Sequence, residues 1–539
     1  MIKLKGLNKL ASRMFCGAAC FIVALALSSC ANTPNIKEAK EDSFTVQVLG
    51  INDFHGQILP KNNEGGMYQL SAHLLKSIES TSDHSFILHA GDHVGASPAE
   101  SALLQDEPSI SFLNTLSQFC INSRNEKCHV IGTAGNHEFD EGSPEMMRLL
   151  KGGNHHKGPF LEAQWQGAEY TNMSANVIDK ETGRGLLPPY VVHTVNGVDI
   201  GFIGLTLDYT PELVVPGAVD NLVFEDQAEV AQRYVQVLKS QGINAIVIIV
   251  HDGTRDEYYA GDTQASSGID VESKFGKFLA KLPASVDLVV TGHSHRFTNA
   301  FFTRNDGSQL LVTQAFSSGR AYADITLTIN TASKDVTHSV AQVILANDAP
   351  TSSLSESAFA SLSKLEALID DSVGYAQAYT QKRINVYAPA QGEKALGQFI
   401  ADSHQYNLQS DMAVMNRGGV RASIQAGELR WGELFAVQPF GNQLVVREYT
   451  GEQLLSVIDS TQHWSSDVSI AEDGQIKFQS QPLELSRTYT VGGNNYIMNS
   501  ESFKIGKQIR IGGLDIDATV EYIESLKTPF SLMDSPQEK

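Results

Sequence analysis

The chain has 539 residues, of which 42% are apolar and 19% are charged, as expected for a globular protein of two or three domains. This composition excludes overall disorder. A formal net charge of −21 argues against binding of a nucleic-acid polymer through a basic face, although bound cations or arginines would still admit an anionic substrate.

Residues 1–29 are predicted to be a lipoprotein signal peptide. Basic residues precede an apolar run, Met14–Leu27, that is too short to span a bilayer comfortably. The run ends in Leu27-Ser28-Ser29-Cys30, which resembles the bacterial lipobox, so Cys30 would become the lipidated first residue. The alternative is an ordinary signal peptide that contains a cysteine. Ala31 follows, and by resemblance to bacterial lipoproteins this favours the outer membrane, facing the periplasm or the surface.

Residues 30–43 are polar and are interpreted as a tether between the lipid anchor and the folded protein. Two of the five cysteines leave with the leader, and Cys30 is the lipidation candidate. Cys120 and Cys128 are then the remaining pair in an exported, oxidising setting, so we expect a local disulfide between them.

The first half of the chain alternates apolar segments with polar clusters that contain or adjoin a glycine. Five such segments are Phe44–Ile51, Ser85–His89, Val130–Gly132, Ala245–Val250 and Val286–Val290. The clusters after them are Asn52-Asp53-Phe54-His55-Gly56, Gly91-Asp92, Gly135-Asn136-His137-Glu138-Phe139-Asp140, His251-Asp252-Gly253 and Gly292-His293-Ser294-His295. A hairpin is expected at Asn196-Gly197, and a helix at Gln227–Ser240. Since open α/β sheets bind ligands at the carboxyl ends of their strands, we expect the clusters to converge.

The character of the sequence changes near residue 347. Apolar residues then recur at helical spacing and predict a connecting helix within 347–375 whose apolar stripe is packed core: Leu354, Phe359, Leu362, Leu365, Leu368 and Ile369. We therefore expect an α/β domain at 44–346 and a second α/β domain at 376–530, with strands around Met412–Met415 and Leu444–Arg447. Residues 531–539 are a tail.

The polar clusters offer the donors of a metal site. The candidate ligands are Asp53, His55, Asp92, Asn136, His251, His293 and His295. Oxygen and nitrogen donors without thiolate suit Zn, Mn, Mg, Ca or Fe rather than Cu(I). His137 can donate a proton to an oxyanion, and Asp140 can keep His137 charged. Taken alone, the hexapeptide at 135–140 could also be an ordinary polar turn.

Together these clusters resemble the metallophosphoesterase superfamily (calcineurin-like), and within it the bacterial 5′-nucleotidase family with its UDP-sugar hydrolases. The resemblance implies a four-layer α/β sandwich joined by a helix to a C-terminal α/β substrate-binding domain. It also implies two divalent ions bridged by Asp92. Asp53, His55 and His295 would complete one site, and Asn136, His251 and His293 the other. His137 would assist hydrolysis by metal-activated water.

The resemblance extends to the second region. Asn416-Arg417-Gly418-Gly419-Val420-Arg421 resembles a substrate loop of the family, in which Arg421 would present a planar fork to phosphate or related oxygens. Phe440 would form one wall of a nucleobase slot and Tyr496 the other. One departure follows Tyr496, where Ser502 takes the place of a ribose-binding Asp, beside Glu501.

The expected function is hydrolysis of 5′-nucleotides, or related nucleotide esters, to nucleoside and phosphate. UDP-sugar hydrolase and 2′,3′-cyclic nucleotide phosphodiesterase are alternatives, and a thiosulfohydrolase-like use of the scaffold is remoter. From a different class, the chain could be a surface lipoprotein that binds nucleotides without turnover. The sequence leaves the metals and the oligomeric state open.

Overall fold

The structure is a computed structural model that describes residues 42–534, apart from 62–63, 82–83, 125–126, 216, 255–258 and 390–394. Cys30, the expected signal peptide and nearly all of the expected tether therefore lie outside the described residues. Within the described part of the chain, none of the helices has the length and apolar character needed to cross a bilayer.

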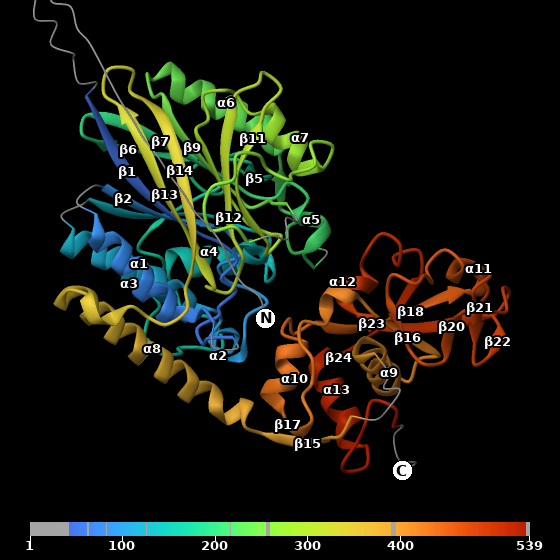
Figure 1. Ribbon diagram of the computed structural model, residues 1–539. Helices are drawn as coiled ribbons and strands as arrows, with labels where there is room; N and C mark the ends of the chain where they lie inside the picture. Colours follow the sequence, from blue (N-terminus) through green and yellow to red (C-terminus); the bar gives the residue numbers. More distant parts are fainter. Residues whose placement is uncertain are drawn as a thin grey trace, which may run out of the picture. The chain divides into compact units, whose positions relative to one another are not determined.

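Two six-stranded sheets form the centre of the first region (Figure 1). The order in the first sheet is β14 (Asp335–Leu345), β13 (Ala321–Asn330), β1 (Ser43–Ile51), β2 (His84–Ala90), β3 (Cys128–Thr133) and β4 (Thr171–Met173). The order in the second sheet is β11 (Phe297–Thr303), β12 (Gln309–Ala315), β10 (Leu288–Thr291), β9 (Ala245–Val250), β7 (Val198–Leu205) and β6 (Tyr190–Val195). Four strands of the first sheet run parallel to one another: β1, β2, β3 and β4. In the second sheet the parallel strands are β7, β9, β10 and β12.

The two sheets pack face to face over a common apolar core. Phe86 of β2 and Phe202 of β7 meet across this core with their ring centroids 4.7 Å apart. All six residues of β9 are buried, which is the pattern of a parallel strand covered on both faces. Burying a side chain of this size contributes about 2–3 kcal/mol, so the sheet pair forms a rigid platform for the loops at its edge.

Helices cover the outer face of each sheet and complete the four expected layers. Against the first sheet lie α1 (Gly66–Ser80), α3 (Glu107–Ser123) and α8 (Glu356–Thr380), and against the second lie α6 (Gln227–Ser240) and α7 (Lys274–Lys281). The predicted hairpin is present as β6–β7, and Cys120 is disulfide-bonded to Cys128. The α/β fold class is therefore confirmed.

Two local predictions in this region are wrong. Phe359 is 54% exposed, because Ala358, four residues before Leu362, takes the buried position of that turn. Val286 precedes β10 instead of starting it, and its carbonyl accepts a hydrogen bond from the buried Arg304 guanidinium at 3.0 Å. Leu362 and Leu365 do pack in the core as expected.

The second region is a smaller α/β unit around a five-stranded sheet. The strand order is β19 (His463–Trp464), β16 (Met412–Met415), β23 (Thr488–Asn494), β18 (Gln443–Thr450) and β24 (Lys507–Leu514). Its helices are α9 (Leu396–Leu408), α10 (Trp431–Val437), α11 (Gly451–Leu454), α12 (Asn495–Met498) and α13 (Asp515–Glu524). Two small sheets join β15 (Arg383–Tyr387) to β17 (Gly427–Arg430), and β20 (Val468–Ile470) to β21 (Ile476–Phe478) and β22 (Gln481–Pro482).

Short elements connect the main ones. In the first region they are α2 (Ala99–Ala102), α4 (Ser143–Lys151), α5 (Thr210–Leu213), the pair β5 (Val177–Asp179) and β8 (Leu222–Phe224), and single 3-10 turns at His137–Phe139 and Thr351–Ser353. A further 3-10 turn, Arg417–Gly419, follows β16. Polar residues on the turns after β3 and β16 line one cavity, described below.

Candidate metal centre

The seven candidate ligands lie on loops that leave the carboxyl ends of parallel strands. Asp53 and His55 follow β1, while Asp92 follows β2. Five of the seven adopt positive φ angles between 48° and 68°, a region that costs a non-glycine residue about 1 kcal/mol or more: Asp53, His55, Asp92, His293 and His295. Such strain is typical of functional sites, because the surrounding fold must hold it in place.

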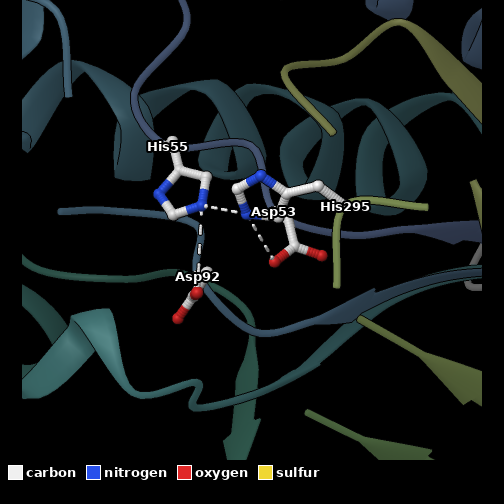
Figure 2. Close-up of side chains that lie close together, drawn as sticks. All are labelled: Asp53, His55, Asp92 and His295. Carbon is white, nitrogen blue, oxygen red and sulfur yellow. Dashed lines mark hydrogen bonds and ion pairs between the residues drawn. The ribbon is translucent and has the colours of Figure 1, made fainter. Parts of the chain in front are cut away.

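The ligand atoms form two groups that share one carboxylate. The first group is Asp53, His55, Asp92 and His295, and the second is Asp92, His251 and His293; within each, the ligand atoms lie within 4.8 Å of one another. Figure 2 shows the side chains of the first group pointing toward one another. Nε2 of His295 is 3.3 Å from Oδ1 of Asp53, and Nε2 of His251 is 3.1 Å from Oδ2 of Asp92.

Asn136 joins the second group through its amide oxygen. Its Oδ1 lies 3.1 Å from Nε2 of His251. All seven sequence-predicted ligands are thus brought together, and Asp92 stands where a carboxylate shared between two ions would stand. The donor set holds carboxylate and amide oxygens and imidazole nitrogens, so it fits two hard or borderline divalent cations.

Carbonyl groups orient two of the imidazoles. His55 donates from Nδ1 to the Gly95 carbonyl at 2.8 Å, and His251 donates from Nδ1 to the Ala90 carbonyl at 2.7 Å. Nε2 of each ring therefore faces the ligand group, where it can bind a cation once it is deprotonated. The backbone N–H of His293 donates to the Asp53 carboxylate at 3.0 Å, which ties the loops after β1 and β10 together.

Burial and charge oppose each other among these histidines. Burial, with further contributions from neighbouring histidines, lowers the pKa of His55 to about 3 and that of His293 to about 4. Burial also acts to lower the pKa of His251, but the Asp92 carboxylate outweighs it and raises the pKa to about 10. The pKa of Asp92 lies well below its usual range, despite burial, because His251 and His137 face it. A cluster with this much carboxylate charge suits cations, which bind deprotonated ligands.

His137 lies beside the cluster but outside both ligand groups. Its Nδ1 contacts Oδ2 of Asp140 at 2.6 Å, and its backbone N–H donates to Oδ1 of Asp92 at 2.9 Å. Burial acts to lower the pKa of His137, but Asp140 and Asp92 raise it to about 9. The imidazole is therefore a cation at neutral pH, able to donate a hydrogen bond or a proton to an anionic group.

A cavity of about 260 Å3 lies next to His137. Residues of both regions line it, including Asn136, His137, Asp140 and His293 from the first and Asn416, Arg421, Phe440 and Tyr496 from the second. The Phe440 ring is nearly parallel to the His137 ring, with their centroids 6.2 Å apart, and the Arg421 guanidinium lies 5.8 Å from the Phe440 ring centroid. The four predicted substrate-binding residues therefore surround the same space as the predicted catalytic pair.

The loop after Tyr496 differs from the sequence-based expectation. The described residues of this loop include Glu501 and Ser502, but both are exposed and neither lines the cavity. The buried Arg447 instead holds this loop through bonds to the Asn499 side chain and the Gly506 carbonyl, both at 2.9 Å. Counting from Tyr496 could not reveal this contact, because Arg447 lies on β18, which is far from the loop in sequence.

Several lining residues were not singled out from the sequence. Asn442 lies two residues after Phe440, so its position in the sequence could have indicated that it lines the cavity. No sequence motif pointed to Asp106, which also lines it. A further group of Glu141, Glu145 and His155 also lies within ligand distance. Arg148 already pairs with both oxygens of Glu145 at 2.8–3.0 Å, so we assign no cation to that group.

Comparisons with known proteins agree with this architecture. Residues 46–297 match the calcineurin-like phosphoesterases, and residues 372–472 match the 5′-nucleotidase C-terminal domain. The chain therefore carries a calcineurin-like metallophosphoesterase domain followed by a 5′-nucleotidase C-terminal domain. The expected class, a metal-dependent phosphoric ester hydrolase, is confirmed by these two matches.

Individual relatives of this metallophosphoesterase are distant. It is 27% identical over 525 residues to Endonuclease YhcR of Bacillus subtilis, a match that covers 92% of this chain but only 41% of that longer protein. It is 24% identical over 475 residues to a 5′-nucleotidase of Vibrio cholerae, covering 81% of this chain and 79% of that one. A 5′-nucleotidase precursor structure from Thermus thermophilus has a similar fold, with a TM-score of 0.69 at 22% identity over 91% of this chain and 98% of that one.

Proposed function

We propose that the chain hydrolyses 5′-nucleotides, or related nucleotide esters, to nucleoside and phosphate. The observation that carries the proposal is the arrangement around Asp92: two ligand groups share this carboxylate, and a charged histidine beside them faces a cavity with two aromatic walls. The similarity to a 5′-nucleotidase of Vibrio cholerae supports a nucleotide substrate. Two divalent ions bound at these groups would polarise phosphoryl oxygens and activate water.

The chain's own residues would position the ester. Arg421 would bind phosphate or substrate oxygens in its planar fork, and Phe440 and Tyr496 would hold the base between their rings. Asn494 donates from its amide to Oδ1 of Asn416 at 2.9 Å, which leaves the Asn416 amide N–H groups free to donate to substrate. His137, kept charged by Asp140, would stabilise the developing charge on the phosphoryl group or assist the leaving oxygen.

A phosphate-release panel tests the proposal. The substrates are AMP, UMP, UDP-glucose, 2′,3′-cyclic AMP and an aryl phosphate, each with and without a chelator; a single-stranded oligonucleotide serves as the polymer control. We expect chelator-sensitive turnover of AMP or UMP. Faster turnover of UDP-glucose or of the cyclic nucleotide would instead select one of those two alternative activities. Binding of AMP without any phosphate release would establish a non-catalytic nucleotide-binding protein.

We also propose that the protein is exported and anchored by lipid on Cys30, with a metallophosphoesterase domain at 44–346, a linker at 347–375 and a substrate-binding domain at 376–530. The linker helix is α8 (Glu356–Thr380), which runs five residues beyond the expected end of the linker. The basic, apolar and lipobox-like sequence at the start supports the anchor. Cys30→Ser should release the protein from the membrane fraction or leave the precursor uncleaved. Unchanged fractionation with a mature N-terminus elsewhere would contradict lipidation at this cysteine.

A further inference from the structure

Glu138 is an ionisable residue of the 135–140 motif that belongs to neither ligand group. Its side chain is partly buried at the wall of the cavity beside His137 and accepts three backbone hydrogen bonds. Oε2 accepts from the N–H of Asp92 at 3.0 Å and from the N–H of Gly135 at 2.5 Å, and Oε1 accepts from the N–H of His93 at 2.7 Å. A single carboxylate thus joins the loop after β2 to the loop after β3.

The two loops approach each other more closely than side chains would allow. A Cβ atom on Gly135 would come within 2.2 Å of Oδ1 of Asp92, and one on Gly91 would come within 2.5 Å of the Gly135 nitrogen. Gly91 also has φ +79°, which favours glycine. The glycines permit the close approach, but they supply no bond that would hold it. The Glu138 carboxylate supplies two bonds across the loops, from the N–H groups of Asp92 and His93, and the Gly135 N–H holds the carboxylate in place. The His137 N–H adds a further bond to the Asp92 carboxylate.

A carboxylate is the side chain that fits these donors. With two oxygens and no hydrogen it can accept all three N–H bonds, whereas a glutamine amide would point its own N–H groups at one of the donors. A buried N–H left without an acceptor is unfavourable, so a glutamine here should drive the loops apart.

The clamped residues adjoin or include candidate ligands. Glu138 binds the backbone N–H of Asp92, whose carboxylate is in both ligand groups. It also binds the N–H of Gly135, the residue directly before Asn136. We propose that Glu138 is a positioning residue that fixes the spacing between Asp92 and Asn136, so that the two cation sites form together. The inference rests on the dimetal site of the proposed function, and it assigns Glu138 no contact with substrate.

Titration of the metal-free protein with Mn2+ alone tests this role. Glu138→Gln should bind Mn2+ about 10–100-fold more weakly than the wild type, the usual effect of losing a residue that supports metal ligands. Its electron paramagnetic resonance spectrum should lose the signal of a coupled Mn2+ pair. Glu79→Gln is the control, because Glu79 also accepts a backbone N–H, that of Ser355 at 3.0 Å, and belongs neither to the ligand groups nor to the cavity lining. The control should bind Mn2+ as the wild type does.

Two further readouts separate positioning from a general loss of folding. Amide hydrogen exchange on the wild-type protein needs no variant, and the N–H groups of Asp92, His93 and Gly135 should be protected even without metal. At saturating Mn2+, Glu138→Gln should regain its kcat with KM for AMP unchanged. Fast exchange of these three amides, or wild-type Mn2+ affinity in Glu138→Gln, would overturn the proposal. Neither result depends on substrate, so a wild type that binds two Mn2+ ions but hydrolyses no nucleotide would refute only the proposed function.

Discussion

Removal of the Asp140 carboxylate should convert a nearly pH-independent enzyme into one that loses activity between pH 6 and 8. Burial acts to lower the pKa of His137, but Asp140, 2.6 Å away, and Asp92 raise it to about 9. In Asp140→Asn the largest favourable contribution disappears, and the pKa falls toward the ordinary value of 6.5. The pKa of His137 in the folded wild type is thus higher than the ordinary value, and His137 stays charged until the pH rises through about 9.

The size of the effect follows from the charged fraction. At pH 8 about 90% of His137 is protonated with a pKa of 9 and about 3% with a pKa of 6.5, so kcat/KM should fall about 30-fold. At pH 6 the two proteins should differ by less than about 2-fold. In the variant, burial still lowers the pKa of His137 and Asp92 still raises it, so these figures take the ordinary value of 6.5 as the balance of the two effects.

The assay is kcat/KM for AMP from pH 5.5 to 9.5 with the metal content of each sample measured in parallel. His137→Ala serves as the comparison: it should lose about 100-fold or more at every pH while keeping its metal. An Asp140→Asn enzyme that is equally impaired at pH 6 and pH 8 would refute the reasoning, as would the loss of one ion from His137→Ala.

Three further outcomes follow from the cavity and its surroundings. Phe440→Ala should raise KM for AMP by about 5-fold or more while barely changing KM for a small aryl phosphate, because base stacking is worth about 1–3 kcal/mol; equal changes for both substrates would remove Phe440 from the base slot. Since neither Glu501 nor Ser502 lines the cavity, kcat/KM for AMP and dAMP should differ by less than about 10-fold, and a stronger preference for AMP would reveal another ribose contact. Burial raises the pKa of Asp515 to about 7 from 3.8, so the stability contributed by its protonated form is complete below about pH 4 and lost as the pH rises through 7. Asp515→Asn should therefore increase the free energy of unfolding at pH 8 by up to about 4 kcal/mol, seen as a higher Tm, and leave Tm at pH 4 nearly unchanged. The same change in Tm at both pH values would contradict this.

The metal centre could be predicted because its residues follow local rules. Each candidate ligand comes directly after a buried apolar strand, and parallel strands bring such positions to one edge. The pairing of His137 with Asp140 needed only a spacing of three residues within one turn. For these reasons local rules predicted that all seven candidate ligands and the histidine beside them would converge, while the division of the ligands into two groups came from the resemblance to the metallophosphoesterases.

Other features depend on contacts between distant segments. Phe359 has the spacing of a core residue, but Ala358 takes the contact with the neighbouring helices. The loop at 499–506 is held by Arg447 of another strand, so its distance from the cavity could not be counted along the chain. The three bonds to Glu138 likewise come from backbone N–H groups, which no pattern of side chains records.

The most direct test of the account is phosphate release from AMP by protein that has been stripped of metal and then titrated with Mn2+. The account predicts that the stripped protein is inactive and that activity rises to its maximum at two ions per chain, in step with formation of a coupled Mn2+ pair. Full activity of the stripped protein, or a maximum reached at one ion per chain, would contradict a centre in which Asp92 serves two cations at once.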